Sequence, residues 1–527
     1  LFTAQTHTIS GNAGVGGANI VFSGLTSGSA IADESTGAYS FSVPTDWTGT
    51  IAPSKTGYRF TPASIQRVTP VLADVPDQNF VATLAPTLTI TNGMPASLVL
   101  GQPNYINSGG STSSTGMHYP MGVAVDPTTG KVFIAEYYNH RVLRFASVEA
   151  LTNGAAAEGV LGQPDFTSNT QGTTQNRMNF PSNLVVDPEG RLWVSDSWNC
   201  RVMRFDNAAS KPDGANADGV LGQPNFTTPP TASTAPTPNQ THYVTGLAVD
   251  ANGHLWVADA HHHRVLRFDD AAAKPNGASA DGVLGQTDFY SEIAETSQRG
   301  MNSPAGLTVD EEGRLWVADQ LNHRVLRFDN AADKSNGSDA DGVLGQVDFV
   351  SNIDATSQSG MYRPFGLTAD SSGRLYVAEI VSHRIVIFDH AAVRQNGSNA
   401  DYVLGQANFN SNESGTDADT LNMPNYIFFD PAIAGLWVAD QTNNRVLLFR
   451  SPEPPQITEG DSVTVDMSWN GSPTPFSLTL HATDLNTGDT LTWSIAVQAE
   501  HGTAAVSGTG NSQDIVYTPD QDYKGPD

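Results

Sequence analysis

Polar side chains of different kinds occupy one position that recurs six times along the chain. They are His118, Asn179, His242, Asn302, Tyr362 and Asn422. Each stands two residues before a proline, except that the third unit has Val244 there. All can form hydrogen bonds, and they differ between units as a specific site requires. We predict that they converge, beside Arg363, Tyr119 and Tyr243, and bind an ion, ordered water or a polar group of a ligand. The alternative is a hollow filled with water alone.

A second recurrent set pairs an acid with an arginine five residues later. The acids are Glu136, Asp196, Asp259, Asp319, Glu379 and Asp440, and the arginines are Arg141, Arg201, Arg264, Arg324, Arg384 and Arg445. A position filled in the same way in every unit cannot form an asymmetric active site. We therefore interpret the pairs as buried ion pairs that fix a turn, rather than as a charged pore lining.

The residue before each arginine raises the question of a metal. These residues are His140, Cys200, His263, His323, His383 and Asn444. If they lie on third strands, they stand about 9 to 10 Å outside the innermost strands, because neighbouring strands are about 4.8 Å apart. Such side chains cannot share one ion held at about 2 Å. Only the run His261–His263 leaves a surface metal contact open. We predict no catalytic residue.

The elements that must position these residues are short strands. The tetrapeptide Val-Leu-Gly-Gln begins at Val99, Val160, Val220, Val283, Val343 and Val403, at intervals of 60 to 63 residues. Each unit contains three further strand patterns separated by turn residues, and six units of four strands predict a six-bladed β-propeller. The aromatic set Phe133, Trp193, Trp256, Trp316, Tyr376 and Trp437 is interpreted as packing between blades. The first Val-Leu-Gly-Gln precedes any inner strand, so we expect it to complete the last blade and close the ring.

In the fourth unit the segments Gly306–Asp310, Gly313–Asp319 and Asn322–Val325 read Gly-Leu-Thr-Val-Asp, Gly-Arg-Leu-Trp-Val-Ala-Asp and Asn-His-Arg-Val. This pattern resembles the NHL repeat, and the resemblance covers residues 89–452. An NHL-type enzyme, the peptidylglycine amidating lyase, is similar in architecture and implies axial histidines that bind zinc. Here only His118 and His242 stand at such positions. A metal-dependent lyase or hydrolase is therefore kept as an alternative, with enzymatic function left uncertain and the balance against it.

Two flanking regions carry further strand patterns, so the predicted fold class is all-β, with a β-sandwich on each side of the propeller. Residues 1–88 are similar to prealbumin-like domains of the carboxypeptidase-regulatory type. Residues 453–527 resemble cadherin-like and Ig-like domains of bacterial surface proteins. Hard oxygen ligands in the second region suggest a possible calcium site. They are Asp484, Asn486, Asp489, Asp520 and Asp522. The alternative is turns in a solvated acidic surface.

Charge and composition narrow the class of function. The net charge of −28, from 54 acidic and 26 basic residues, would repel a phosphate backbone, so nucleic acid is not an expected partner. Cys200 is the single cysteine, which excludes an intrachain disulfide, and no apolar run is long enough for a transmembrane helix. We expect a segment of a secreted or cell-surface protein, of bacterial type.

Loops that enter the inner strands, such as 167–179 and 227–241, differ most between units. They are rich in Thr, Ser, Asn, Gln and Pro, which suits contact with a protein or glycan surface. The expected function is therefore a non-catalytic interaction or adhesion module. The alternative from another class is a structural subunit of an extracellular filament or surface layer, which would self-associate.

Overall fold

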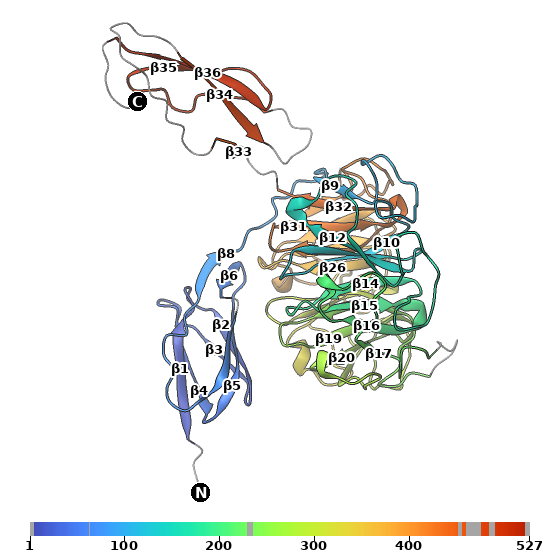
Figure 1. Cartoon of the computed structure of the whole chain (residues 1–527). Helices are drawn as coiled ribbons and strands as arrows, with labels where there is room; N and C mark the ends of the chain where they lie inside the picture. Colours follow the sequence, from blue (N-terminus) through green and yellow to red (C-terminus); the bar gives the residue numbers. More distant parts are fainter. Residues whose placement is uncertain are drawn as a thin grey trace. The chain divides into compact units, whose positions relative to one another are not determined.

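The computed structural model describes residues 5–62, 64–228, 235–451, 456–459, 476–483 and 491–521. The chain divides into two compact units, Leu1–Arg450 and Ser451–Asp527. The described residues form β-strands and one-turn 3-10 helices (Figure 1). The all-β prediction is confirmed. No helix of the described part is long and apolar enough to cross a membrane.

Six four-stranded antiparallel sheets, called sheets 1 to 6, follow one plan within the described residues. Sheet 1 is β10 (Pro120–Val125), β11 (Lys131–Glu136), β12 (Arg141–Ser147) and β13 (Gly159–Leu161); sheet 2 is β14 (Pro181–Val186), β15 (Leu192–Asp196), β16 (Arg201–Phe205) and β17 (Gly219–Leu221). Sheet 3 is β18 (Val244–Val249), β19 (Leu255–Asp259), β20 (Arg264–Phe268) and β21 (Gly282–Leu284); sheet 4 is β22 (Pro304–Val309), β23 (Leu315–Asp319), β24 (Arg324–Phe328) and β25 (Gly342–Leu344). Sheet 5 is β26 (Pro364–Ala369), β27 (Leu375–Glu379), β28 (Arg384–Phe388) and β29 (Tyr402–Leu404); sheet 6 is β30 (Pro424–Asp430), β31 (Gly435–Asp440), β32 (Arg445–Arg450) and β9 (Leu98–Leu100).

The sheets stand side by side around a ring. Each inner strand contacts the inner strand of the next sheet, and β30 contacts β10. The contacts are close: a Cβ on Gly246 would lie 2.0 Å from the carbonyl oxygen of Ala305, and one on Gly306 would lie 2.0 Å from that of Phe365. Glycine is therefore required where neighbouring inner strands meet. The arrangement is a β-propeller of six sheets, as predicted.

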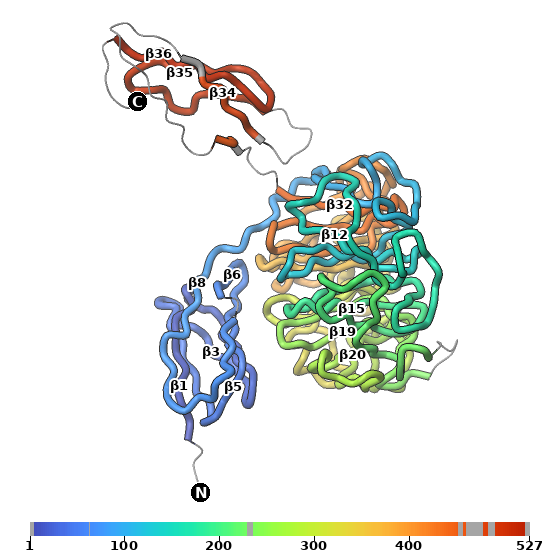
Figure 2. The backbone as a smooth tube through the Cα atoms, in the orientation of Figure 1, coloured from blue at the N-terminus to red at the C-terminus, as the bar shows by residue number. Residues whose placement is uncertain are grey.

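The ring is closed by strands from the two ends of the propeller sequence. β9 pairs antiparallel with β32, with Leu98 opposite Leu448 and Leu100 opposite Val446. Figures 1 and 2 show this blue strand beside the orange strands of sheet 6. The predicted closure is confirmed, and it leaves no free sheet edge at the seam.

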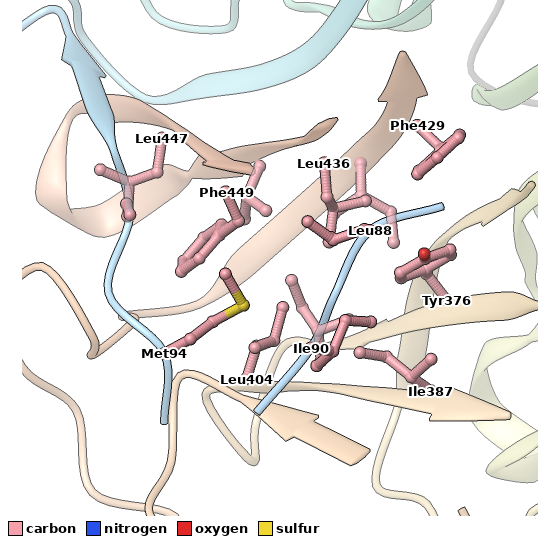
Figure 3. Packing of buried hydrophobic residues seen from close by; sticks show 14 of the residues in the cluster. Leu88, Ile90, Met94, Tyr376, Ile387, Leu404, Phe429, Leu436, Leu447 and Phe449 are labelled. Carbon is pink, nitrogen blue, oxygen red and sulfur yellow. The ribbon is translucent and has the colours of Figure 1, made fainter. Parts of the chain in front are cut away.

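The hydrophobic core lies between neighbouring sheets. Figure 3 shows one cluster, in which Leu88, Ile90 and Met94, which precede β9, pack among side chains of sheets 5 and 6. The recurrent aromatic residues join such clusters: Tyr376 of sheet 5 stacks on Phe429 of sheet 6, with ring centroids 5.6 Å apart. Their interpretation as packing between blades is confirmed.

Short 3-10 helices connect the strands. They are η1 (Val148–Ala150), η2 (Ser197–Asn199), η3 (Ala208–Ser210), η4 (Ala260–His262), η5 (Ala271–Ala273), η6 (Gln320–Asn322), η7 (Ala331–Asp333), η8 (Ala391–Val393) and η9 (Gln441–Asn443). Those directly after a second strand, such as η2 and η6, end at a residue in the left-handed conformation, here Cys200 and His323. This conformation turns the chain tightly into the third strand.

The N-terminal region forms a sandwich with its own core. Its strands are β1 (Thr6–Asn12), β2 (Asn19–Gly24), β3 (Gly28–Ile31), β4 (Ala38–Pro44), β5 (Trp47–Ser54), β6 (Tyr58–Thr61), β7 (Ile65–Val71) and β8 (Val81–Leu84). β1 pairs with β4, a second sheet has the order β3-β2-β5-β7, and β6 pairs with β8. Alternate residues of β4, namely Tyr39, Phe41 and Val43, are buried beside Trp47. The likeness to prealbumin-like domains stays a prediction.

The C-terminal region is described in part. β33 (Gln456–Ile457), β34 (Phe476–Thr483), β36 (Ser512–Pro519) and β35 (Gly502–Ala505) pair in that order. Of the predicted calcium ligands, Asp484, Asn486, Asp489 and Asp522 lie outside the described residues. Asp520 is described, and its backbone N–H donates to the carbonyl oxygen of His501 at 2.9 Å. Calcium binding stays a prediction.

Candidate ligand-binding site at one end of the propeller

The six predicted site residues stand at the same end of the ring, directly before the inner strands. In each sheet their backbone N–H donates to the acid that ends the second strand, at 2.6 to 2.9 Å. In sheet 2, for example, Asn179 donates to Asp196 at 2.6 Å. The backbone of this position therefore serves the architecture, and only its side chain is free to vary.

Each of these acids also forms a fully buried ion pair with the arginine of its sheet. Arg324 Nε lies 2.7 Å from Asp319 Oδ2, and both side chains are completely buried. The same guanidinium donates to the carbonyl oxygens of Ser297 and Gly300, at 2.8 and 3.0 Å, and to that of Phe349. It thus ties together the loops before and after its own sheet. The structural interpretation of the recurrent pair is confirmed.

The residue before each arginine joins neighbouring sheets. His263 Nδ1 accepts a hydrogen bond from the backbone N–H of Ser303 in the next sheet at 3.0 Å, and His140, His323 and His383 accept equivalent bonds at 2.9 to 3.2 Å. In sheet 6 the Asn444 side-chain oxygen accepts from Tyr119 at 2.8 Å. Sequence reasoning missed this role, although the replacement of histidine by asparagine, which offers an acceptor at similar reach, was a signal for it.

These contacts favour the neutral form of the histidines. Because Nδ1 accepts, it carries no proton, and burial lowers the pKa of His140, His263, His323 and His383 below the ordinary histidine value. Among the described residues no group of three or more His, Cys, Asp or Glu side chains could hold a metal. The side chains of the run His261–His263 contact different partners. The His262 ring is buried, and its Nδ1 lies 2.8 Å from Asp259 Oδ2, while the His261 ring stacks on Tyr243.

Sheets 1 and 2 carry a cluster of aromatic side chains at this end, which we call the aromatic platform. It comprises His118, Tyr119, Tyr137, Tyr138, Phe180 and Trp198. Ring centroids of neighbours lie 4.6 to 5.7 Å apart. Trp198 and Tyr138 stay 51% and 42% exposed, although both are large and apolar. Burial lowers the pKa of His118, which favours the neutral ring.

Hydrogen bonds extend the platform to sheet 3. Trp198 Nε1 donates to the Tyr137 hydroxyl at 2.8 Å, and that hydroxyl lies 3.2 Å from the hydroxyl of Tyr243. The His242 ring packs edge-on against His261, 4.7 Å between centroids. Burial, and then the charge of His262, lower the pKa of His242. Predicted residues from sheets 1 and 3 are thus connected through Tyr137.

The rest of the predicted set lies on the other half of the ring. The ring centroids of Tyr362 and His323 lie 5.5 Å apart, and the Asn422 side chain lies beside that of Asn443. Asn302 is half-buried, and Arg363 is exposed. Within the described residues no hydrogen bond joins the side chains of His118, Asn179, His242, Asn302, Tyr362 and Asn422 to one another. That these side chains converge on one ligand stays a prediction.

Behind the platform an inner-strand tyrosine is buried among several sheets. Tyr426 of β30 is 3% exposed and packs with Met121, Phe365 and Tyr137. Its hydroxyl faces Ser182 and Thr245 in sheets 2 and 3, and burial raises its pKa well above the ordinary tyrosine value.

The opposite end of the propeller is acidic. A cavity of about 110 Å³ there is lined by Asp310, Glu311 and Asp370 together with apolar side chains of sheets 4 to 6. Burial, with the charges of Glu312, Asp310 and Asp370, raises the pKa of Glu311 to about 7. Ion pairs at this end are partly exposed, as in Arg314 and Asp310, whose Nε and Oδ2 lie 2.8 Å apart.

Comparisons with known proteins agree with this architecture. The NHL repeat matches residues 117–145, 178–205, 241–268 and 301–328. The chain contains NHL repeats. Residues 452–527 match the bacterial Ig domain, which supports the Ig-like prediction, while the cadherin-like likeness stays a prediction. The four NHL segments each run from the site position into the third strand, so the repeat contains the acid and arginine pair described above.

A curated relative from Arabidopsis thaliana, "Protein SUPPRESSOR OF QUENCHING 1, chloroplastic", is 23% identical over 248 residues, 43% of this chain and 20% of that protein. The chain thus matches about a fifth of that relative's length. A structural genomics protein of unknown function from Bacteroides thetaiotaomicron covers 82% of this chain and 90% of its own, at 14% identity and a TM-score of 0.43. A streptogramin B lyase covers 65% of this chain and 95% of its own, at 12% identity and a TM-score of 0.37.

Proposed function

We propose that this chain belongs to a secreted or cell-surface protein in which the propeller is a non-catalytic binding module, and that the aromatic platform binds a glycan. The observation that carries the proposal is the exposure of Trp198 and Tyr138 on a rigid sheet end. Exposed aromatic rings offer an apolar face to the C–H side of a sugar, while their polar atoms and neighbours reach its hydroxyls.

Polar groups around the rings support this ligand class. The side-chain oxygen of Asn179 is buried without a hydrogen-bond partner, beside the platform residue Phe180. Burial lowers the pKa of His118 and His242, which favours neutral rings that can donate or accept. Sugar hydroxyls suit such mixed donors and acceptors. The match to the bacterial Ig domain supports an extracellular setting.

Binding of purified protein to a glycan array, followed by calorimetry with the sugars retained, tests the proposal. We expect Trp198→Ala to weaken binding by roughly tenfold or more, the usual effect of removing a central aromatic contact. The matched control is Leu321→Ala, which changes the equivalent turn position of sheet 4, where the side chain is 37% exposed. Equal affinity of both variants and the unchanged protein would refute the platform as the site.

Two measurements separate the alternatives. Metal analysis of the purified protein tests a metal-dependent lyase or hydrolase, which requires a tightly held ion. Light scattering against protein concentration tests a filament or surface-layer subunit, which requires self-association.

A further inference from the structure

Two neighbouring loops at the same end of the propeller expose large apolar side chains. These loops, 285–303 and 345–363, enter sheets 4 and 5. The exposed residues are Tyr290, Ile293, Val347, Val350 and Ile353, each 69 to 73% exposed. We call them the apolar loop pair. Exposed apolar groups of this kind on a soluble protein mark interaction sites when they are gathered together.

The two loops are held side by side. Buried Arg324 donates to carbonyl oxygens of both, through Ser297 and Gly300 of the first loop and Phe349 of the second. In addition, the Asn352 side chain donates to the Thr296 hydroxyl at 3.4 Å. The apolar side chains on these loops therefore belong to one surface rather than to separate projections.

Hydrogen bonds also fix the backbone of each loop at its exposed isoleucine. The buried Gln286 side chain accepts from the N–H of Ile293 at 3.1 Å and donates to its carbonyl oxygen at 2.8 Å. Gln346 holds Ile353 in the same way, at 3.2 and 2.8 Å. A preformed surface loses little conformational entropy when a partner binds.

The fold does not require apolar residues at these positions. In three other loops the equivalent glutamine donates to the carbonyl oxygen of Gly109, Thr170 or Glu413, at 2.7 to 3.0 Å. The backbone contact is thus the same with glycine, threonine or glutamate in place of isoleucine. Packing does not explain Ile293 and Ile353, since both side chains project into solvent.

Charge indicates the partner. The two loops contain five acidic residues, Asp288, Glu292, Glu295, Asp348 and Asp354, against Arg299 and Arg363. Arg299 lies 3.5 Å from Asp339, which offsets its charge. We propose that the apolar loop pair binds a basic segment of a partner protein that presents alternating apolar and cationic side chains. A second copy of this acidic chain would place like charges against each other.

The experiment uses the whole chain and two short synthetic peptides, one of alternating lysine and leucine and one of alternating glutamate and leucine, followed by fluorescence anisotropy. We expect the lysine peptide to bind and the double variant Ile293→Thr with Ile353→Thr to weaken binding by roughly tenfold. Threonine occupies the equivalent position at Thr170, so the variant keeps the loop contact. The control Ile106→Thr removes an exposed apolar residue, 65% exposed, from a loop outside the pair, and we expect unchanged binding.

A second arm tests the charges. Glu292→Gln with Asp354→Asn should weaken the lysine peptide and flatten its dependence on salt, because screening acts on exposed charges. Equal binding of the lysine peptide to the isoleucine double variant and the unchanged protein would overturn the proposal, as would equal binding of the glutamate peptide. Self-association in light scattering that the double variant abolishes would assign the surface to a second copy instead.

Discussion

The two ends of the propeller are built from the same residue types and differ in burial. At the platform end each of the six recurrent acid and arginine pairs is fully enclosed, as in Asp319 and Arg324. At the opposite end the pair Asp310 and Arg314 leaves its arginine side chain 21% exposed. The enclosed pairs are needed for folding, because a buried charge that loses its partner lowers the stability of the folded state. An acid and arginine pair therefore contributes differently to stability at the two ends.

Breaking one pair at each end tests this comparison most strongly. Arg324→Met leaves Asp319 buried without its guanidinium, and we expect a loss of about 3 to 5 kcal/mol. Arg314→Met is the matched control, for which exposed pairs predict a loss of about 1 kcal/mol or less. Urea denaturation followed by tryptophan fluorescence compares the two. Similar midpoints for both variants would contradict the difference between the ends.

The buried acid at the opposite end gives a smaller effect that depends on pH. The pKa of Glu311 is raised to about 7, so the folded state binds this proton more tightly than the unfolded state. Its contribution to stability is present below the unfolded value and is lost as the pH rises through about 7. Glu311→Gln keeps the neutral shape. We expect this variant to raise the free energy of unfolding by about 1 to 2 kcal/mol near pH 8. Near pH 4 we expect the free energy of unfolding to change little.

Thermal unfolding at the two pH values measures this effect. Stabilisation by Glu311→Gln that is equal near pH 4 and near pH 8 would show that charge is not its cause.

The histidines at the platform end predict the opposite dependence. Their pKa values are lowered in the folded state, so their contribution is present above the unfolded value and is lost as the pH falls. His323→Asn imitates Asn444 and keeps an acceptor for the backbone N–H of Arg363. We expect it to lessen the loss of stability between about pH 7 and about pH 5 by about 0.5 to 1 kcal/mol, the value of one hydrogen bond.

The control for this variant is His323→Ala, which removes the acceptor and should lower stability at both pH values. If His323→Asn and His323→Ala behave alike in thermal unfolding, the Nδ1 contact does not link the sheets as described.

The sequence repeats made the buried ion pairs and the closure of the propeller predictable. The recurrence of Asp or Glu before Arg, and the early position of Val99, sufficed for the buried pairs and for the closure by β9. The platform could not be derived in this way. Trp198 and Tyr138 occupy one turn position, which holds His261, Leu321, Val381 or Thr442 in the other units, so the repeat does not specify an aromatic residue there. A periodic pattern predicts the backbone that all units share at this turn, but not the side chain that varies there.

The pairing of β9 with β32 also determines how the propeller responds to tension. The chain enters the pair at Leu98, opposite Leu448, and leaves it at Arg450. Entry and exit are therefore at the same end of an antiparallel pair. Pulling on the two flanking regions would separate these strands one hydrogen bond at a time instead of shearing all of them together. Such a force would first strip Leu88, Ile90 and Met94 from sheets 5 and 6 and would then open sheet 6, before the other sheets of the ring.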